Sequence, residues 1–320
     1  MRTVAWSIPM TTRFRQITVR EGLLLHGDAG WGEFSPFLDY SGDELVGWLA
    51  AAIEAAEFGF PDPVRTRIPV NVTIPAVDAL TAHRMASASG CRTAKIKVAE
   101  PGQTLSDDLD RVEGVRDALG PGGKLRIDAN GAWDVETAVD ALRQLGRFGL
   151  EYAEQPCRTV TELATLRRDL ARRGISVPIA ADESIRRAGD PELVAKLEAA
   201  DIAVLKVQPL GGVRRCLRLA ETLGLPVVVS SALETSVGIR MGLALAAALP
   251  ELPYACGLNT VPLLTDDVAM SPLAAVDGVI EVGALEVDEV ALARVSASVE
   301  RQTWWDERLA ATRVSLKENR

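Results

Sequence analysis

The segment KLRIDANGAWDVETAVDALRQLGRFGLEYAEQP, residues 124–156, contains the unit from which the fold is built. Lys124–Asp128 and Leu150–Glu154 are short runs rich in strand-forming residues, and each ends in an acidic side chain. Between them, apolar residues such as Ala138 and Leu142 recur at the spacing of one helix face. This order predicts a strand, a helix and a second strand parallel to the first.

Runs of the same kind recur roughly every 25 residues along most of the chain, with helix-like stretches between them. The other predicted strands are Pro69–Ile74, Thr93–Val98, Val177–Asp182, Ile202–Val207, Pro226–Ser231 and Tyr254–Leu258. Strand and helix alternating about eight times predict an α/β fold with a parallel sheet, and favour a closed (β/α) barrel. A doubly wound open sheet is the structural alternative.

The first 65 or so residues follow a different pattern. A strand pair is predicted around Arg13–Arg20 and Leu23–Gly30, followed by an alanine-rich helix over Asp43–Glu57. We therefore expect an N-terminal α+β capping domain. The predicted division of the chain is a cap of residues 1–65, a barrel of residues 66–279, and a C-terminal segment of residues 280–320 that joins the cap.

Charge and hydropathy exclude several classes of function. The 35 Lys and Arg residues against 44 Asp and Glu give a formal net charge of −9, and no basic run is present, so nucleic acid is not expected as a partner. The strongest apolar stretch, around Met241–Leu249, is far shorter than a membrane span, and no export signal is visible. These features predict a cytoplasmic protein with no membrane contact and no obligatory protein partner.

Cysteine and histidine are scarce. The cysteines contain no CxxC pair, which predicts buried thiols rather than disulfides or a thiolate zinc site; they are Cys91, Cys157, Cys216 and Cys256. With only His26 and His83 in the chain, a zinc HExxH site is excluded and a Ser-His-Asp triad is not expected. Any catalysis must therefore depend on carboxylates and lysines.

Charged residues stand where consecutive predicted strands end: Lys95 and Lys97, then Asp128, Glu154, Asp182 and Lys206. The carboxyl ends of barrel strands form the rim at which active sites of this fold lie. Lys97 and Lys206 are four strands apart in a ring of eight, so we expect them to face each other across the mouth. Lys95 shares the inner face with Lys97 because side chains alternate along a strand.

Three carboxylates converging on one arc would repel one another unless a hard cation lay between them, and Mg²⁺ is the cation such oxygens favour. We therefore interpret Asp128, Glu154 and Asp182 as metal ligands. A neighbouring cation and partial burial would lower the pKa of Lys97 and allow it to act as a base. Considered alone, each of these residues could equally be interpreted as a solvated charge at the rim or as a helix cap, without a catalytic role.

The chain resembles the enolase superfamily, muconate-lactonizing subgroup, in an ordered set of five motifs. The motifs are KxK (Lys95 and Lys97), DAN (from Asp128), EQP (from Glu154), DES (from Asp182) and LK (Lys206). The resemblance implies a capped barrel of the enolase type, Mg²⁺ (or Mn²⁺) on the three carboxylates, and a metal-stabilised enediolate. It also implies that Lys97 is the base, that Lys206 is an electrostatic partner on the opposite face, and that Lys95 tunes Lys97.

Four further segments, Phe14–Gly22, Gly30–Phe37, Asn71–Ala76 and Ser230–Gly238, are similar to a hydro-lyase branch of this subgroup. That resemblance implies a carbon–oxygen lyase that removes water by syn elimination from a small carboxylate, 2-succinyl-6-hydroxy-2,4-cyclohexadiene-1-carboxylate, in menaquinone biosynthesis. Candidates for substrate contact, with a capping role as the alternative, are Ser230, Ser231 and Glu234 after the seventh strand and Asn259 after the eighth. We interpret Gly30–Phe37 as a cap loop that closes on the substrate, and the alternative is an aromatic-anchored turn of the cap domain.

Other functions remain open at this point. An N-acylamino acid or dipeptide epimerase, or a muconate cycloisomerase, would keep the metal and both lysines. Relatives that racemise N-succinylamino acids have an arginine where this chain has Pro209, which disfavours the racemase reading. A catalytically silent scaffold that binds Mg²⁺ or carboxylates is disfavoured because every charged position is intact.

Overall fold

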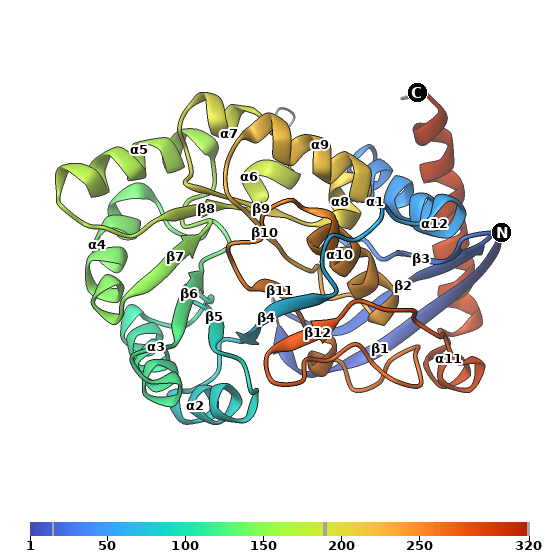
Figure 1. Ribbon diagram of the computed structural model, residues 1–320, viewed down its shortest axis with the longest axis horizontal. Helices are drawn as coiled ribbons and strands as arrows, with labels where there is room; N and C mark the ends of the chain where they lie inside the picture. Colours follow the sequence, from blue (N-terminus) through green and yellow to red (C-terminus); the bar gives the residue numbers. More distant parts are fainter. Residues whose placement is uncertain (15, 188–190, 319–320) are drawn as a thin grey trace.

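Eight parallel strands form a closed barrel in the computed structural model, which describes residues 1–14, 16–187 and 191–318 (Figure 1). Hydrogen-bonded neighbours run from β4 to β10 in chain order, β11 pairs with β4, and a bridge between Ser230 and Gly257 closes the ring. The strands are β4 (Arg67–Ile74), β5 (Thr93–Lys97), β6 (Lys124–Asp128), β7 (Leu150–Glu154), β8 (Ile179–Ala181), β9 (Ile202–Leu205), β10 (Val227–Val229) and β11 (Cys256–Asn259). The predicted closed barrel is confirmed, and each strand lies within or beside its predicted run.

Helices follow the strands and cover the outside of the barrel, as Figure 1 shows for α2 to α5. They are α2 (Ala79–Ala88), α3 (Leu105–Leu119), α4 (Val135–Leu145), α5 (Val160–Arg172), α6 (Glu183–Arg186), α7 (Leu193–Lys196), α8 (Val207–Leu210), α9 (Val213–Leu223) and α10 (Ser236–Ala248). Thr104 and Thr159 begin α3 and α5 with reciprocal capping boxes. After β11 the chain instead forms a 3₁₀ turn, Val261–Leu263, and then β12 (Val279–Glu281), antiparallel to β4.

The N-terminal region forms an antiparallel sheet of β1 (Arg2–Phe14), β2 (Ile17–Gly27) and β3 (Gly30–Phe34). The helix α1 (Glu44–Ile53) then continues as a π-helical turn over Glu54–Phe58, close to the predicted range. This sheet and helix are the predicted α+β cap, and their positions are visible beside the barrel in Figure 1.

The predicted strand pair in the cap is wrong in its limits. Arg13–Arg20 spans the turn between β1 and β2, and Leu23–Gly30 runs from β2 to the start of β3. The first strand begins at Arg2, and its pattern is obscured by Pro9 and by polar residues near its end. A proline is tolerated there because β1 is an edge strand, so one side of its backbone has no strand partner.

The C-terminal helices α11 (Glu289–Val295) and α12 (Val299–Glu318) lie against the cap. The side chain of Gln302 accepts a hydrogen bond of 2.7 Å from the backbone N–H of Ala5. Trp305 is fully buried and packs edge-on against Phe34 at 6.1 Å between ring centroids. The C-terminal segment therefore contacts the cap, while the domain limits at residues 65 and 279 stay predictions.

Two other expectations concern surface and core. The four cysteines are free and buried, as predicted.

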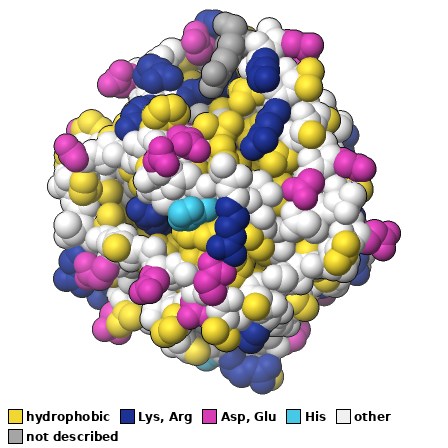
Figure 2. All heavy atoms as spheres, turned by 90° about the vertical axis from the view of Figure 1, so that its right-hand side faces the viewer, with side chains coloured by type: hydrophobic (Ala, Val, Ile, Leu, Met, Phe, Trp, Pro, Cys, Tyr) yellow, Lys and Arg dark blue, Asp and Glu magenta, His cyan; other side chains and the backbone are white. Residues whose placement is uncertain are grey.

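In the part of the chain that the structure describes, no helix combines the length and apolar character needed to cross a membrane. On the cap side of the molecule, basic and acidic side chains are interspersed with apolar ones (Figure 2).

Candidate active site

Six buried charged residues gather at the carboxyl end of the barrel. Lys95 and Lys97 lie on β5, Asp128 and Glu154 end β6 and β7, Asp182 follows β8, and Lys206 follows β9. Lys97 is in register with Asp128, and Asp128 with Glu154, so consecutive strands bring these groups to one level. Lys97 and Lys206 line a single cavity from strands four places apart in the ring. The structure thus brings together the lysines and carboxylates that the sequence singles out.

Each carboxylate has a lysine partner. The Nζ atom of Lys97 lies 2.5 Å from Oδ2 of Asp128 and donates a second hydrogen bond of 2.7 Å to Oδ1 of Asn130. Lys95 contacts both carboxylate oxygens of Glu154, at 3.1 and 3.0 Å. These bonds fix both β5 lysines against the neighbouring strands.

On the opposite side of the mouth, Lys206 Nζ lies 2.6 Å from Oδ2 of Asp182. The other oxygen of Asp182 accepts a hydrogen bond of 2.8 Å from Nε of Arg186, which the sequence-based reasoning missed. The backbone N–H of Asp182 donates to the side-chain oxygen of Gln155 at 2.9 Å. The signal for Arg186 was its place four residues after Asp182, on the same face of a helical turn.

The pKa values at the mouth follow from burial and neighbouring charge. Burial raises the pKa of each carboxyl, but Lys97 and Lys95 outweigh it at Asp128, whose pKa lies well below its usual range. Burial and the charge of Asp128 raise the pKa of Glu154. Burial and Glu183 raise the pKa of Asp182 to about 7. Burial opposes the charge on Lys95, yet Glu154 and Asp128 raise its pKa overall.

The donor chemistry fits a hard divalent cation. Asp128 raises the pKa of Glu154, and Glu154 raises that of Asp182, so these anionic groups are close enough to repel one another. Carboxylate oxygens are the ligands that Mg²⁺ and Mn²⁺ favour. Among the described residues no three such groups surround a common point, because each carboxylate is turned toward a lysine.

The cap contributes two aromatic rings to the cavity, one from each of two segments that the sequence analysis singled out. Phe14 and Phe37 line the cavity, and the Phe14 ring centroid is 5.2 Å from Nζ of Lys97. The guanidinium of Arg20 lies 4.4 Å from the Phe37 ring centroid and donates to the carbonyl of Leu233 at 3.0 Å. Arg20 therefore connects the cap to the barrel loop that follows β10.

Several non-glycine residues at this edge have a left-handed backbone. They include Asn130 (φ 48°), Gln155 (φ 41°) and Leu233 (φ 62°), each just beyond the end of a barrel strand. Such strained conformations persist where the surrounding structure fixes them, and they concentrate at functional sites. Here they turn the chain so that Asn130 reaches Lys97 and Gln155 reaches Asp182.

The four candidate substrate residues occupy different places. Ser230 and Ser231 line the cavity, and Oγ of Ser230 is 3.4 Å from Nζ of Lys95. Glu234 is buried and accepts a hydrogen bond of 2.8 Å from the backbone N–H of Ala232. Asn259 accepts a bond of 3.0 Å from the backbone N–H of Ala275, outside the cavity lining. Substrate contact by any of the four stays a prediction.

The interpretation of Gly30–Phe37 as a loop is wrong for most of its length. Gly30–Phe34 forms β3, and Glu33 and Ser35 are buried. Ser35 and the side chain of Gln208 hydrogen-bond across the cap–barrel boundary. Only the end of the segment, at Phe37, reaches the cavity. The sequence predicts a loop here because glycine and proline are typical of turns, and this segment contains two glycines and a proline.

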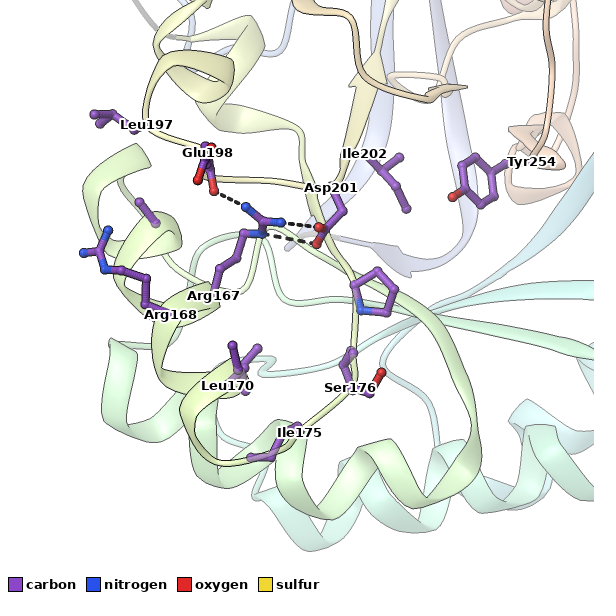
Figure 3. Close-up of a pocket in the computed structure, with 14 residues that line it drawn as sticks. Arg167, Arg168, Leu170, Ile175, Ser176, Leu197, Glu198, Asp201, Ile202 and Tyr254 are labelled. Atoms are coloured by element: carbon purple, nitrogen blue, oxygen red, sulfur yellow. Dashed lines mark hydrogen bonds and ion pairs between the residues drawn. The ribbon is translucent and has the colours of Figure 1, made fainter.

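A further cavity lies at the opposite end of the barrel, where α5 meets the starts of β8 and β9 (Figure 3). Arg167 in this cavity binds both carboxylate oxygens of Asp201 and the backbone carbonyl of Glu198. Oδ2 of Asp201 also accepts a hydrogen bond of 2.8 Å from the backbone N–H of Ile179. Interactions at this face of a barrel serve stability, and the site is therefore assigned to the lysine end.

The fold and the mouth together define a class: a capped barrel of the enolase type that carries lysines paired with carboxylates at the carboxyl ends of its strands. Family models agree, since residues 78–286 match "Enolase C-terminal domain-like" and residues 5–56 match "Enolase N-terminal domain-like". Among solved structures, muconate lactonizing enzyme from Pseudomonas fluorescens has a TM-score of 0.78 at 23% identity, covering 92% of this chain and 98% of that one. An N-succinyl Arg/Lys racemase from Bacillus cereus has the same TM-score at 20% identity, over 92% and 97%. At these identities the likeness concerns the fold alone.

Sequence relatives are closer. The o-succinylbenzoate synthase of Thermobifida fusca is 60% identical over 98% of this chain and 96% of its own length. The enzymes of that name from Mycolicibacterium smegmatis and Mycobacterium tuberculosis are 52% and 50% identical over 95% of this chain, and over 93% and 91% of their own. The chain belongs to the o-succinylbenzoate synthase family of the enolase superfamily. It is accordingly an enzyme of the hydro-lyase class.

Proposed function

We propose that the protein catalyses the syn dehydration of 2-succinyl-6-hydroxy-2,4-cyclohexadiene-1-carboxylate to o-succinylbenzoate and water, as a cytoplasmic step of menaquinone biosynthesis. The observation that carries the proposal is that Lys97 and Lys206 face one cavity from opposite sides, beside Asp128. The relatives named after this product support it, because they match nearly the whole chain.

Mg²⁺, with Mn²⁺ as a substitute, is the proposed cofactor, and Asp128, Glu154 and Asp182 are its proposed ligands. A C–H bond next to a carboxylate is very weakly acidic, because its loss places a second negative charge on the carboxylate oxygens. When bound, the metal would stabilise that charge as it develops. The three carboxylates are suited to this because all three are buried at the carboxyl ends of consecutive strands, with Asp128 and Glu154 in register.

Lys97 is the proposed base. It removes the proton from the ring carbon that bears the carboxylate and returns it to the hydroxyl group that leaves from the same face. Water departs, and the ring becomes aromatic. Asn130 accepts a hydrogen bond from Lys97 and so fixes where its Nζ atom points. Because a base must first be neutral, the ion pair of Lys97 with Asp128 has to weaken before proton transfer.

The other two lysines have supporting roles in this proposal. Lys206 stays protonated on the opposite face and stabilises the planar anion. Lys95 is bound to Glu154 and places a positive charge on the inner face it shares with Lys97, which favours the neutral form of that amine.

The test is direct, because dehydration converts a cyclohexadiene into a benzene ring and changes the ultraviolet spectrum. With Mg²⁺ present, we expect turnover by the natural chain and a loss of roughly 100- to 10,000-fold in kcat for Lys97→Ala. Lys124→Ala, at the exposed start of β6, is the matched control and should keep full activity. Failure of the natural chain to form o-succinylbenzoate would refute the proposal.

The alternatives give different results in the same assay. An epimerase would exchange the α-proton of both enantiomers of an N-succinylamino acid in deuterated water, because it needs a base on each face. A muconate cycloisomerase would act on muconate, and a silent scaffold on none of these compounds. We expect dehydration to exceed racemisation greatly in kcat/KM, in keeping with Pro209 at the position where racemising relatives have an arginine.

A further inference from the structure

A cavity of about 860 Å³ lies between the cap and the barrel, next to the lysine site. Asn130, which binds Lys97, and Arg186, which binds Asp182, both form part of its wall. Phe37 lines this cavity as well as the one that contains the lysines. A substrate whose reacting carbon is at Lys97 therefore has room for a substituent in this space.

The wall of this cavity is rich in arginine. Its basic members are Arg20, Arg186, Arg187 and Arg301, and its acidic members are Glu21, Asp39 and Glu183. Arg187 donates a hydrogen bond of 2.7 Å to Asp39, and Arg301 one of 2.5 Å to Glu21. The remaining surface is supplied in part by apolar side chains of Ile17, Val19 and Leu38.

Three side chains of α12 near this cavity have a buried N–H group without a partner among the described residues. Arg301, Trp305 and Arg308 share one face of α12, since they are four and three residues apart. Each has a buried N–H without an acceptor among the described residues: Nε of Arg301, Nε1 of Trp305 and Nη1 of Arg308. Such unmet donors are rare in folded proteins and call for a functional explanation.

Arg308 stands directly behind the cavity wall. Its Nη2 atom donates to the carbonyl oxygens of Phe37, at 3.1 Å, and Tyr40, at 2.7 Å, and both residues line the cavity. Burial and the positive charge of Arg301 lower the pKa of Arg308 to about 10. Two guanidinium groups are thus held close together beside the cavity, and an anion there would relieve their repulsion.

The proposed substrate is a dianion. One carboxylate is on the ring, next to the carbon that reacts, and the other ends the succinyl arm. We infer that Arg301, which lines the cavity and has the guanidinium of Arg308 behind it, binds the carboxylate at the end of this arm. This inference rests on the proposed function, and it assigns substrate specificity to a residue of the C-terminal helix.

The experiment compares two ligands that differ only at the distal group. Product o-succinylbenzoate has the second carboxylate, whereas 2-butyrylbenzoate has a methyl group in its place. Their dissociation constants are measured by titration calorimetry on the Mg²⁺-loaded enzyme. In Arg301→Met we expect o-succinylbenzoate to bind roughly 10- to 100-fold more weakly, with little change for 2-butyrylbenzoate. Arg313→Met, an exposed arginine on the same helix, is the matched control and should change neither.

Loss of Arg301 also leaves Glu21 without its ion-pair partner, and this carboxylate alone would repel a dianion. The double variant Arg301→Met with Glu21→Gln separates the two effects. We expect it to remain weak toward o-succinylbenzoate, because the contact with Arg301 is absent. Recovery of natural affinity in the double variant would overturn the inference.

Equal weakening of both ligands in Arg301→Met would also overturn it, because a purely structural defect does not discriminate between them. So would unchanged affinity for both. These outcomes are distinct from failure of the proposed function, which appears as absence of dehydration by the natural chain. If dehydration occurs and the two ligands respond alike to the variant, only the assignment of Arg301 is wrong.

Discussion

At the scale of single residues, the mouth of the barrel balances its charges pairwise. Lys97, Lys95 and Lys206 each bind one of the three strand-end carboxylates. Burying an unpaired carboxylate costs several kcal/mol, so these lysines compensate the charge of the buried carboxylates.

Removal of one carboxylate should weaken metal binding. In Asp182→Asn we expect Mg²⁺ to bind at least roughly 100-fold more weakly by titration calorimetry, because a charged oxygen ligand is replaced by a neutral amide. Asp134→Asn is the matched control, since Asp134 is exposed and begins α4. Natural Mg²⁺ affinity in the Asp182 variant would exclude Asp182 from the metal site.

At the scale of elements, the cap fixes the start of a barrel helix. Thr235 is the residue that begins α10, and its hydroxyl donates a hydrogen bond of 2.5 Å to Glu33 on β3. Glu33 also accepts from the backbone N–H of Gly238, at 3.0 Å, which is one of the N–H groups left free at a helix start. A carboxylate from one region of the chain thus caps a helix in the other.

This contact should make stability depend on pH. Burial and the charge of Glu234 raise the pKa of Glu33 to about 7, above its value in an unfolded chain. The folded protein then retains a proton on Glu33 that the unfolded chain releases, so the contribution of Glu33 to stability is fully present below about pH 4.5 and is lost as pH rises through 7. We expect Glu33→Gln to reduce this loss, by on the order of 3 kcal/mol in the free energy of unfolding.

Urea unfolding at pH 4.5, 6 and 8 measures this dependence. Glu136→Gln, which removes an exposed carboxylate from the first turn of α4, is the control and should behave as the natural chain does. If Glu33→Gln and the natural chain lose the same free energy between pH 4.5 and 8, Glu33 is not the titrating group.

At the scale of the whole molecule, the two ends of the chain combine in one region. Figure 1 shows both termini on the same side, with α12 beside β1 to β3 and α1. Buried aromatic residues fill the space between them, among them Phe34, Trp48 and Trp305. These residues form a core separate from that of the barrel, which is built mainly from Val, Leu, Ile and Ala.

The packing predicts a local response to loss of Trp305. Trp305→Ala should cost about 3–5 kcal/mol, because a fully buried ring is removed from a close-packed core. Hydrogen exchange should accelerate in α1 and β1 to β3 more than in the barrel strands. The neighbouring Trp304 is 36% exposed, and Trp304→Ala should have a much smaller effect. Equal acceleration throughout the chain would show that cap and barrel unfold as one unit.

The sequence was sufficient for the barrel because its strands are short, regularly spaced and buried on both faces. It was insufficient for β1, because Pro9 lies inside this strand and a proline is tolerated there only at the edge of a sheet. The place of Arg301 could not be found either, because α12 is far along the chain from β2 and from Asn130 after β6, and only folding brings all three to one cavity.

By itself, the sequence determined the barrel, the cap and the order of lysines and carboxylates along the rim. These follow from local periodicity, since a strand that ends in a charged residue puts that residue at the rim wherever the strand lies in the ring. Only the tertiary structure decided which lysine binds which carboxylate, how Glu33 reaches α10, and where α12 meets the cavity between the cap and the barrel. Such contacts join residues separated by up to 280 positions, and they depend on packing geometry that no local pattern encodes.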